Sequence, residues 1–194
     1  MDYKKYIEDC LMDSSETKRI MAVSYAGRIE EVADRIVLSY QLGGKVIAFG
    51  NGGSAADAQH FVAEFVGRYQ MADRKPLAAI ALNTNVSTIT AIGNDFGYDD
   101  LFLRQMLALG KPLDVAVGIS TSGNSPNVVK AMKAAGAMGL YTVALTGRKD
   151  SELSRIAGYA INVPSDSVPR IQEAHIAVMH VICGLVEQKL YGKK

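Results

Sequence analysis

The sequence predicts an α/β fold in which helices cover both faces of a five-stranded parallel sheet. Five apolar runs of strand length recur along the chain, and helical stretches separate most of them. The runs are almost continuously apolar, which is typical of parallel strands that are buried on both faces. The predicted strands are KVIAF at 45–49, AAIAL at 78–82, DVAVGI at 114–119, YTVALT at 141–146 and YAINV at 159–163.

Helices are predicted before the first strand and after the last one. Residues 1–42 read as helical, with apolar residues at helical spacing until Gly43 and Gly44 end the pattern. The last helix is predicted from about Val168 to Leu190. Residues 1–42 exceed what such a sheet needs, so they either supply an oligomer interface or lie over the sheet. The apolar stripe in this segment consists of Ile29, Val32, Ala33, Ile36, Val37 and Tyr40.

The first predicted strand runs into a glycine-rich loop and a helix, GNGGSAADAQHFVAEF at 50–65. Gly50, Gly52 and Gly53 permit a tight turn, and Ser54 with Asp57 resembles a capping box at the start of the helix. This loop would bring backbone N–H groups and a helix N-terminus to the carboxyl edge of the sheet, where anions bind. A glycine-rich turn with a capped helix and no ligand explains the loop equally well.

His60 and Glu64 follow in the same predicted helix, four residues apart. About 40° separates them around the helix axis, so both side chains can point into one site. Taken alone, such a pair is usually a surface contact. One to two turns below a loop that suits a phosphate, the pair becomes a candidate base with a metal ligand or orienting group.

A second polar loop, STSGNSPNVVKAM at 120–132, follows the third predicted strand. Pro126 suits the first position of a helix, with Ser125 as its N-cap. One cap uses one hydroxyl, so the others indicate donors that converge on an anion at the helix N-terminus. Before Pro126 the loop holds neither Lys nor Arg, which favours a sugar phosphate; an unliganded serine-rich turn is the less favoured alternative. The four hydroxyls belong to Ser120, Thr121, Ser122 and Ser125.

The last predicted helix carries two histidines on different faces. His175 lies in an apolar stripe, where we expect a packed or locally hydrogen-bonded side chain. Gln172 and His180 lie on a neighbouring face, about 12 Å apart along the axis, and could meet at a metal or a substrate across that gap. From the residues alone, His180 is interpreted as a helix-packing residue. The stripe around His175 consists of Ile171, Val178, Ile182 and Leu185.

Composition excludes several classes of protein. The 194 residues are 48% hydrophobic and 21% charged, with a net charge of +1, which is ordinary for a globular protein and gives no nucleic-acid or membrane surface. Cys10 and Cys183 are too few for a disulfide framework. The charged N-terminus lacks the apolar core of a signal peptide, and no apolar run approaches the ~18 residues of a membrane span. We therefore expect a cytoplasmic protein with neither nucleic acid nor membrane as partner.

Four separated segments closely resemble the phosphoheptose isomerase family of the SIS (sugar isomerase) superfamily. They are GNGGSAADAQHFVAEFVGRY, AIGNDFGY, GISTSGNSPNV and RIQEAHIAVMH, and the resemblance runs from Gly43 to Glu187. It implies a flavodoxin-like sandwich as a single SIS domain over residues 1–194, with residues 1–42 as an N-terminal helical extension. It further implies a homotetramer with active sites between subunits and one zinc ion per subunit.

The resemblance also implies an activity and roles for individual residues. Such enzymes convert sedoheptulose 7-phosphate to D-glycero-D-manno-heptose 7-phosphate through an enediol, the first step of bacterial ADP/GDP-heptose synthesis. Glu64 becomes the base that enolises the substrate, and His180 becomes the general acid. Together with His60 and Gln172 they would bind the zinc, a set of nitrogen and oxygen ligands without thiolates.

Substrate contacts are implied by the same resemblance. Asn94 and Asp95, which the residues alone place in an Asx-type turn between a short helix and Gly97, would bind substrate hydroxyls from a neighbouring subunit. Arg68 is a phosphate or interface residue, or an exposed arginine at a helix end. The residues implied to bind substrate are Asn51, Gly52, Gly53, Ser54, Glu64, Asn94, Asp95, Ser120, Thr121, Ser122, Ser125 and Gln172.

An alternative function belongs to a different class. Some SIS proteins are not isomerases, and bind the bacterial replication initiator or sense sugar phosphates. Both His180 and the run Ser120-Thr121-Ser122-Gly123 are present here, and they favour the enzyme. The identity of the metal, the anomer formed and the glycan that receives the heptose stay open at this level.

Overall fold

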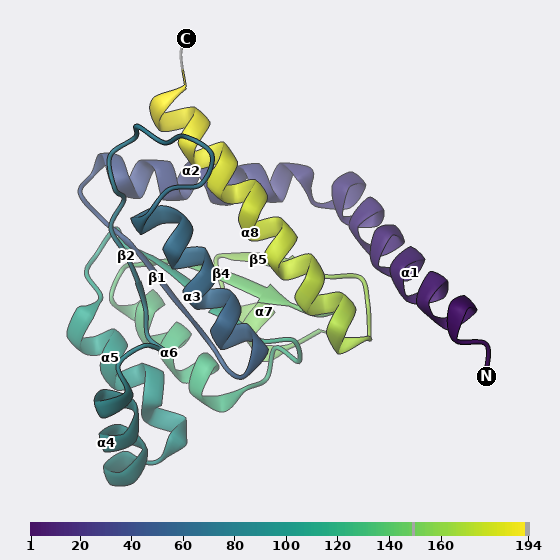
Figure 1. The fold of residues 1–194 in the computed structure, drawn as a ribbon. Helices are drawn as coiled ribbons and strands as arrows, with labels where there is room; N and C mark the ends of the chain where they lie inside the picture. Colours follow the sequence, from purple (N-terminus) through teal and green to yellow (C-terminus); the bar gives the residue numbers. More distant parts are fainter. Residues whose placement is uncertain (149, 193–194) are drawn as a thin grey trace.

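The computed structural model describes residues 1–148 and 150–192, and over these residues the chain folds into three layers. A five-stranded parallel sheet forms the middle layer, with strand order β2-β1-β3-β4-β5 (Figure 1). The predicted α/β fold is confirmed, although residues 149, 193 and 194 of the expected domain lie outside the described part. The strands are β1 (Val46–Gly50), β2 (Ala79–Ala81), β3 (Val115–Ile119), β4 (Tyr141–Thr146) and β5 (Tyr159–Asn162).

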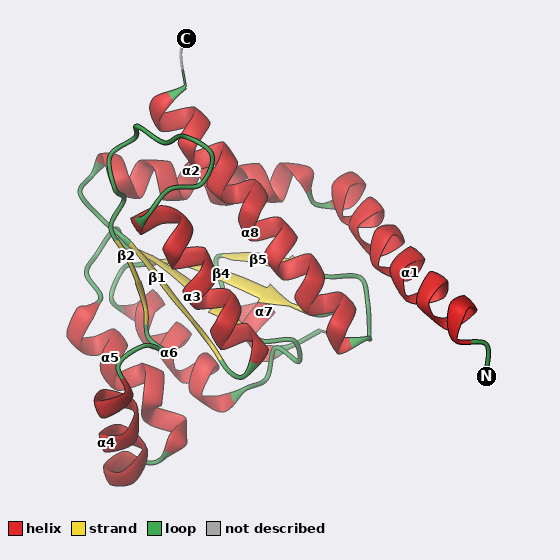
Figure 2. Cartoon of the chain, in the orientation of Figure 1, coloured by secondary structure: helices red, strands yellow, loops and turns green. Residues whose placement is uncertain are grey.

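Helices cover both faces of the sheet (Figure 2). On one face lie α2, α3 and α8, and on the other lie α4, α5, α6 and α7. Across the described residues, none of the helices combines the length and apolar character that a bilayer span requires. The helices are α1 (Tyr3–Ser24), α2 (Ala26–Gln41), α3 (Gly53–Val66), α4 (Val86–Phe96), the 3₁₀ turn η1 (Tyr98–Asp100), α5 (Leu101–Leu109), α6 (Pro126–Ala137), α7 (Glu152–Ile156) and α8 (Val168–Tyr191).

Each strand contributes to two hydrophobic cores, because successive side chains of a strand point to opposite faces. Val46, Val117 and Leu145 pack on the α8 side of the sheet. Ile47 and Phe49 pack on the opposite side, against α5 and α6. Since both sets are buried, the strands hold few polar residues, chiefly Thr142 and Thr146 in β4 and Asn162 in β5, which explains why the predicted runs are almost continuously apolar.

The two N-terminal helices divide the roles that the sequence left open. The apolar stripe of α2 is buried over the sheet, as the spacing predicted. By contrast, α1 extends away from the body of the fold (Figure 1), and only Thr17 and Met21 are buried within it. Most of the other large apolar side chains of α1 face solvent in the single chain. These exposed residues are Tyr3, Tyr6, Ile7, Leu11, Met12 and Val23.

The order in which strands are added to the sheet reverses at β1: β2 pairs with one edge of β1, and β3 pairs with the other edge. Strands β1 and β3 have Gly50 opposite Ile119 at their carboxyl ends. After β1 the chain enters α3 on the α8 face, whereas after β3 it enters α6 on the opposite face. The loops at 51–52 and 120–125 therefore diverge from adjacent points, which leaves a crevice of the kind that binds ligands in open α/β sheets.

His175 is fully buried between α8 and the end of β4, as its place in the apolar stripe predicted. Its Nε2–H donates to the carbonyl oxygen of Thr146 at 3.1 Å, which ties α8 to the carboxyl end of β4. Burial lowers the pKa of His175 to about 4, and the hydrogen bond to Thr146 only partly opposes this effect. The imidazole is therefore a neutral structural group at physiological pH.

We expect His175 to make the protein acid-sensitive. In the unfolded chain His175 is protonated below its usual pKa of 6.5, whereas in the folded protein it stays neutral down to about pH 4. The free energy of unfolding should therefore be undiminished by this residue above pH 6.5, and should fall by up to about 3 kcal/mol as the pH drops toward 4. Denaturant unfolding at stepped pH should show the stability gap between wild type and His175→Gln narrowing toward pH 4. If the difference in unfolding free energy between wild type and His175→Gln stayed constant with pH, His175 would not be buried as a neutral imidazole.

Candidate functional site

The first loop turns on Gly52, which is the N-cap of α3 and has a φ of +56°. The prediction that Ser54 caps this helix in a box with Asp57 was wrong. A positive φ at Gly52 starts the helix two residues earlier, so Ser54 lies buried in the first turn and no side chain caps α3. Burial also raises the pKa of Asp57, one turn further along the helix.

The second loop brings its hydroxyls together at the start of α6. Ser125 is the N-cap and Pro126 is the first helical residue, as predicted. Instead of capping the helix, Ser125 Oγ lies 3.0 Å from Ser120 Oγ, which in turn lies 3.4 Å from Ser122 Oγ. The Ser120 hydroxyl also accepts the N–H of Gly123 at 3.1 Å. Three hydroxyls thus converge at a helix N-terminus, where an anion is favoured.

Both loops line a small pocket of about 100 Å³ in the crevice between β1 and β3. The amide of Gln172, from α8, closes it against the first loop. A Cβ atom placed on Gly53 would lie only 2.4 Å from Gln172 Nε2, so the glycine makes room for this amide. Six of the twelve residues expected to bind substrate line this pocket. The pocket is lined by Asn51, Ser54, Ile119, Ser120, Thr121, Ser125 and Gln172.

Asn51 joins the two loops through its side chain. Its Nδ2 donates to Asn127 Oδ1, and Asn127 Nδ2 donates back to Asn51 Oδ1, both at 2.9 Å. The Tyr98 hydroxyl also donates to Asn51 Oδ1 at 2.9 Å. Sequence analysis gave no role to Asn127 or Tyr98. The available signal was an asparagine directly after Pro126 in a helix whose neighbouring residues are apolar.

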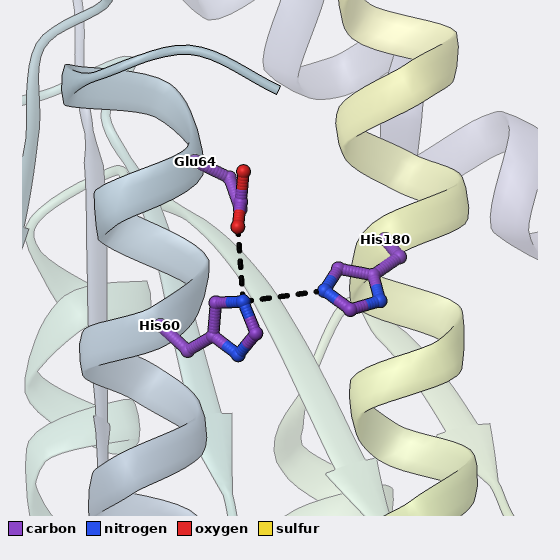
Figure 3. Close-up of side chains that lie close together, drawn as sticks. All are labelled: His60, Glu64 and His180. Atoms are coloured by element: carbon purple, nitrogen blue, oxygen red, sulfur yellow. Dashed lines mark hydrogen bonds and ion pairs between the residues drawn. The ribbon is translucent and has the colours of Figure 1, made fainter. Parts of the chain in front are cut away.

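His60, Glu64 and His180 meet between α3 and α8 (Figure 3). His60 Nε2 lies 2.9 Å from Glu64 Oε1 and 3.3 Å from His180 Nε2. The side chain of Glu64 is 19% exposed and that of His60 is 47% exposed, so small molecules can reach the group. Spacing predicted the pairing within α3, and the fold adds His180 from 120 residues away.

The donor set of this group fits a metal ion. A single N–H on His60 Nε2 cannot serve Glu64 and His180 equally, whereas a cation can accept a lone pair from all three residues. Ligand atoms at 2.0–2.1 Å from a tetrahedral zinc ion lie about 3.3 Å from one another; two of the separations here are 2.9 Å and 3.3 Å, and all three ligand atoms lie within 4.8 Å of one another. Cys183, one turn after His180, is buried, and burial raises the pKa of its thiol.

Three residues expected at the site lie apart from this group in the single chain. Gln172 precedes His180 by eight residues, about 12 Å of helical rise, and its amide lies against Gly53. Asn94 and Asp95 are exposed in the last turn of α4, on the opposite face of the sheet. The expectation that they follow a helix is corrected, because α4 continues to Phe96 and ends at Gly97, whose φ is +84°.

Two further features border the group, and sequence analysis assigned neither. The ring of Tyr69 stacks on the imidazole of His180, with 5.7 Å between ring centroids and 20° between planes. A buried pair, Arg74 and Glu187, lies beneath the same region. The available signal was a glutamate at a buried position of α8, among apolar neighbours.

Comparison with known proteins gives one consistent result. The SIS domain family matches residues 11–147. The probable phosphoheptose isomerase of Thermoplasma acidophilum is 51% identical, covering 97% of this chain and 100% of the relative. The phosphoheptose isomerase of Sulfurimonas denitrificans is 47% identical, covering 97% of each chain.

Solved structures agree with these sequence relatives. Phosphoheptose isomerase GmhA from Neisseria gonorrhoeae is 39% identical with a TM-score of 0.89, covering 96% of this chain and 99% of that one. A phosphoheptose isomerase from Francisella tularensis is 34% identical with a TM-score of 0.92, covering 97% and 100%. The similarity therefore extends over nearly the whole length of these proteins.

We expect the group of His60, Glu64 and His180 to bind one Zn²⁺ per chain in a titration monitored by calorimetry or chelator competition. Loss of one of three ligands should weaken the affinity by about 100-fold or more, so His60→Ala is the test variant. Gln59→Ala is the matched control, because Gln59 is exposed on the same helix and, among the described residues, its amide is hydrogen-bonded to the backbone of Ala55 alone. Equal affinities of wild type and His60→Ala would exclude this group as the site.

Proposed function

This chain belongs to the SIS domain family and, within it, to the phosphoheptose isomerases, and from this premise we propose that it converts sedoheptulose 7-phosphate to D-glycero-D-manno-heptose 7-phosphate. One observation carries the proposal beyond family membership. A carboxylate and two imidazoles meet between α3 and α8, and a cluster of hydroxyls lies at a helix N-terminus beside Gln172, about 12 Å away along α8. The first set suits proton transfer, and the second suits a phosphate.

Glu64 is the proposed base. A ketose becomes an aldose when a proton moves from C1 to C2 through an enediol, and one carboxylate can remove and return that proton. Oε1 of Glu64 faces His60, and we assign the proton transfer to Oε2. His180 is the proposed acid, which gives a proton to the carbonyl oxygen and takes one from the neighbouring hydroxyl. Glu64 projects from α3 and His180 from α8 (Figure 3), so the two groups can act on different atoms of a substrate that lies between these helices.

His60, Glu64 and His180 would hold the metal, and Gln172 is proposed as a further ligand, which requires its amide to move from its position against Gly53 in the single chain. The nitrogen and oxygen donors suit zinc. When bound, such an ion polarises a carbonyl and holds adjacent oxygens. His60 then serves to orient Glu64, which it contacts at 2.9 Å.

The phosphate is proposed to lie against Ser120, Ser122 and Ser125 at the start of α6. About 12 Å of rise along α8 separates Gln172, beside these hydroxyls, from His180. A seven-carbon chain with a terminal phosphate can extend over that distance. Its anchored end then orients the reacting end without taking part in the chemistry.

Assembly into a homotetramer is part of the proposal. Asn94 and Asp95 lie on the far face of the sheet, so a second copy of the chain is needed to bring them to this site. The exposed apolar side chains of α1 would be buried in such an assembly. A cytoplasmic location agrees with the two free cysteines, Cys10 and Cys183.

Replacing Glu64 with Gln should nearly abolish isomerisation while the fold and substrate binding remain largely intact. The amide keeps the shape of the side chain and loses the proton acceptor, so kcat should fall by roughly 10²–10⁴-fold. The measurement is aldose formation from sedoheptulose 7-phosphate. Glu31→Gln is the control, because Glu31 is exposed on α2 and its ion pair within the described part of the chain is with the neighbouring Arg28. An activity of Glu64→Gln within about tenfold of wild type would remove Glu64 as the base.

The hydroxyl cluster gives a separate prediction. Ser122→Ala and Ser125→Ala should each raise KM, because a hydrogen bond to a charged acceptor contributes on the order of 1 kcal/mol or somewhat more. Inorganic phosphate should compete with the substrate, and sedoheptulose without its phosphate should react very poorly. The measurement is steady-state kinetics with sedoheptulose 7-phosphate and with sedoheptulose. Comparable rates for the two sugars would show that the loop is a turn that binds no phosphate.

A further inference from the structure

Residues 67–76 fold back over the ends of α3 and α8, and one carboxylate holds them there. Glu187 accepts three successive backbone N–H groups, from Tyr69 at 3.0 Å, Gln70 at 2.9 Å and Met71 at 3.0 Å. Arg74 Nε donates to the same carboxylate at 2.5 Å. Although burial disfavours the charged form, these four bonds keep the pKa of Glu187 below its usual value.

Arg74 extends this network to the end of α3. Its Nη1 donates to the carbonyl oxygens of Phe65 at 2.9 Å and Lys75 at 3.0 Å, and its Nη2 donates to the carbonyl of Glu64. The side chains of Arg74 and Glu187 are only 1% and 2% exposed. A buried ion pair is retained without large cost only when its hydrogen bonds are satisfied, as they are here. The network therefore fixes the loop relative to both helices that carry the reacting groups.

The position of Tyr69 follows from this anchoring. Its ring lies over α8, where a Cβ atom on Gly184 would lie 3.4 Å from Tyr69 Cε1, and it stacks on His180. The ring torsion of a histidine has a broad minimum, so contacts must decide which way the imidazole faces. Tyr69 covers one face of the ring while His60 approaches its Nε2 edge.

We propose that Tyr69 is a positioning residue that sets the ring orientation of His180, and that the Arg74–Glu187 pair holds Tyr69 in place for this purpose. The consequence for turnover rests on the proposed function, whereas the orientation of the ring does not. Glu187 acts on the loop backbone, so replacing the Tyr69 side chain leaves the buried network intact and tests the stack alone.

The test compares Tyr69→Leu with Tyr69→Phe, and uses Gln70→Leu as a control in the same loop. The His180 ring-proton shifts are measured by NMR on the full chain without substrate, assigned with His180→Ala. In Tyr69→Leu these shifts should move because the neighbouring ring current is lost, and in Tyr69→Phe and Gln70→Leu they should stay near wild type. With sedoheptulose 7-phosphate, Tyr69→Leu should lose roughly tenfold or more in kcat, with KM within about threefold, because misplaced groups slow the chemical step.

The outcomes separate this proposal from the proposed function. Unchanged His180 shifts in Tyr69→Leu would overturn the positioning role whatever the enzyme does. A shifted ring with unchanged kcat would overturn its importance for turnover. If wild type failed to isomerise the sugar, the proposed function would fall, while the NMR comparison would still support or refute the control of His180 by Tyr69.

Discussion

The positions of the two loops that line the pocket depend on the pairing of β1 with β3. Because the chain leaves these neighbouring strands toward opposite faces of the sheet, the loops after them start side by side and diverge. Two hydrogen bonds between Asn51 and Asn127 then hold the loops at a fixed separation. Within this pair each amide donates one bond and accepts one, so the buried side chain of Asn127 has both its nitrogen and its oxygen paired. The connection thus sets the spacing of the two loops that line the pocket.

A second constraint is the parallel packing of α3 and α8. Gly53 meets Gln172 at one end of the helix pair, and His60 meets His180 further along. The two contacts are nearly the same distance apart on both helices, so a single relative position of the helices satisfies both. Packing of α8 on the sheet, including the bond from His175 to Thr146, sets that position. The residues proposed to react thus depend on an interior histidine that takes no part in the reaction.

The sequence was sufficient for the fold and for part of the site. Buried parallel strands have a distinctive apolar pattern, and helical spacing placed His60 with Glu64. Local pattern failed at Ser54, because the backbone conformation of Gly52 decides where α3 begins. It could not place His180 beside His60, since that contact depends on how α3 and α8 pack. Tyr69 was missed for a similar reason, because its position follows from a carboxylate 118 residues away.

The burial of Cys183 has a consequence for oxidative chemistry. Its thiol lies one turn from His180 and near two carboxylates, and both burial and those charges raise its pKa. Peroxides attack the thiolate, and a buried neutral thiol offers very little of it. The sulfur is thus shielded from sulfenic acid formation and from competing with the imidazoles for a soft metal. A cysteine adjacent to the groups proposed to react can therefore persist without making the enzyme sensitive to redox stress.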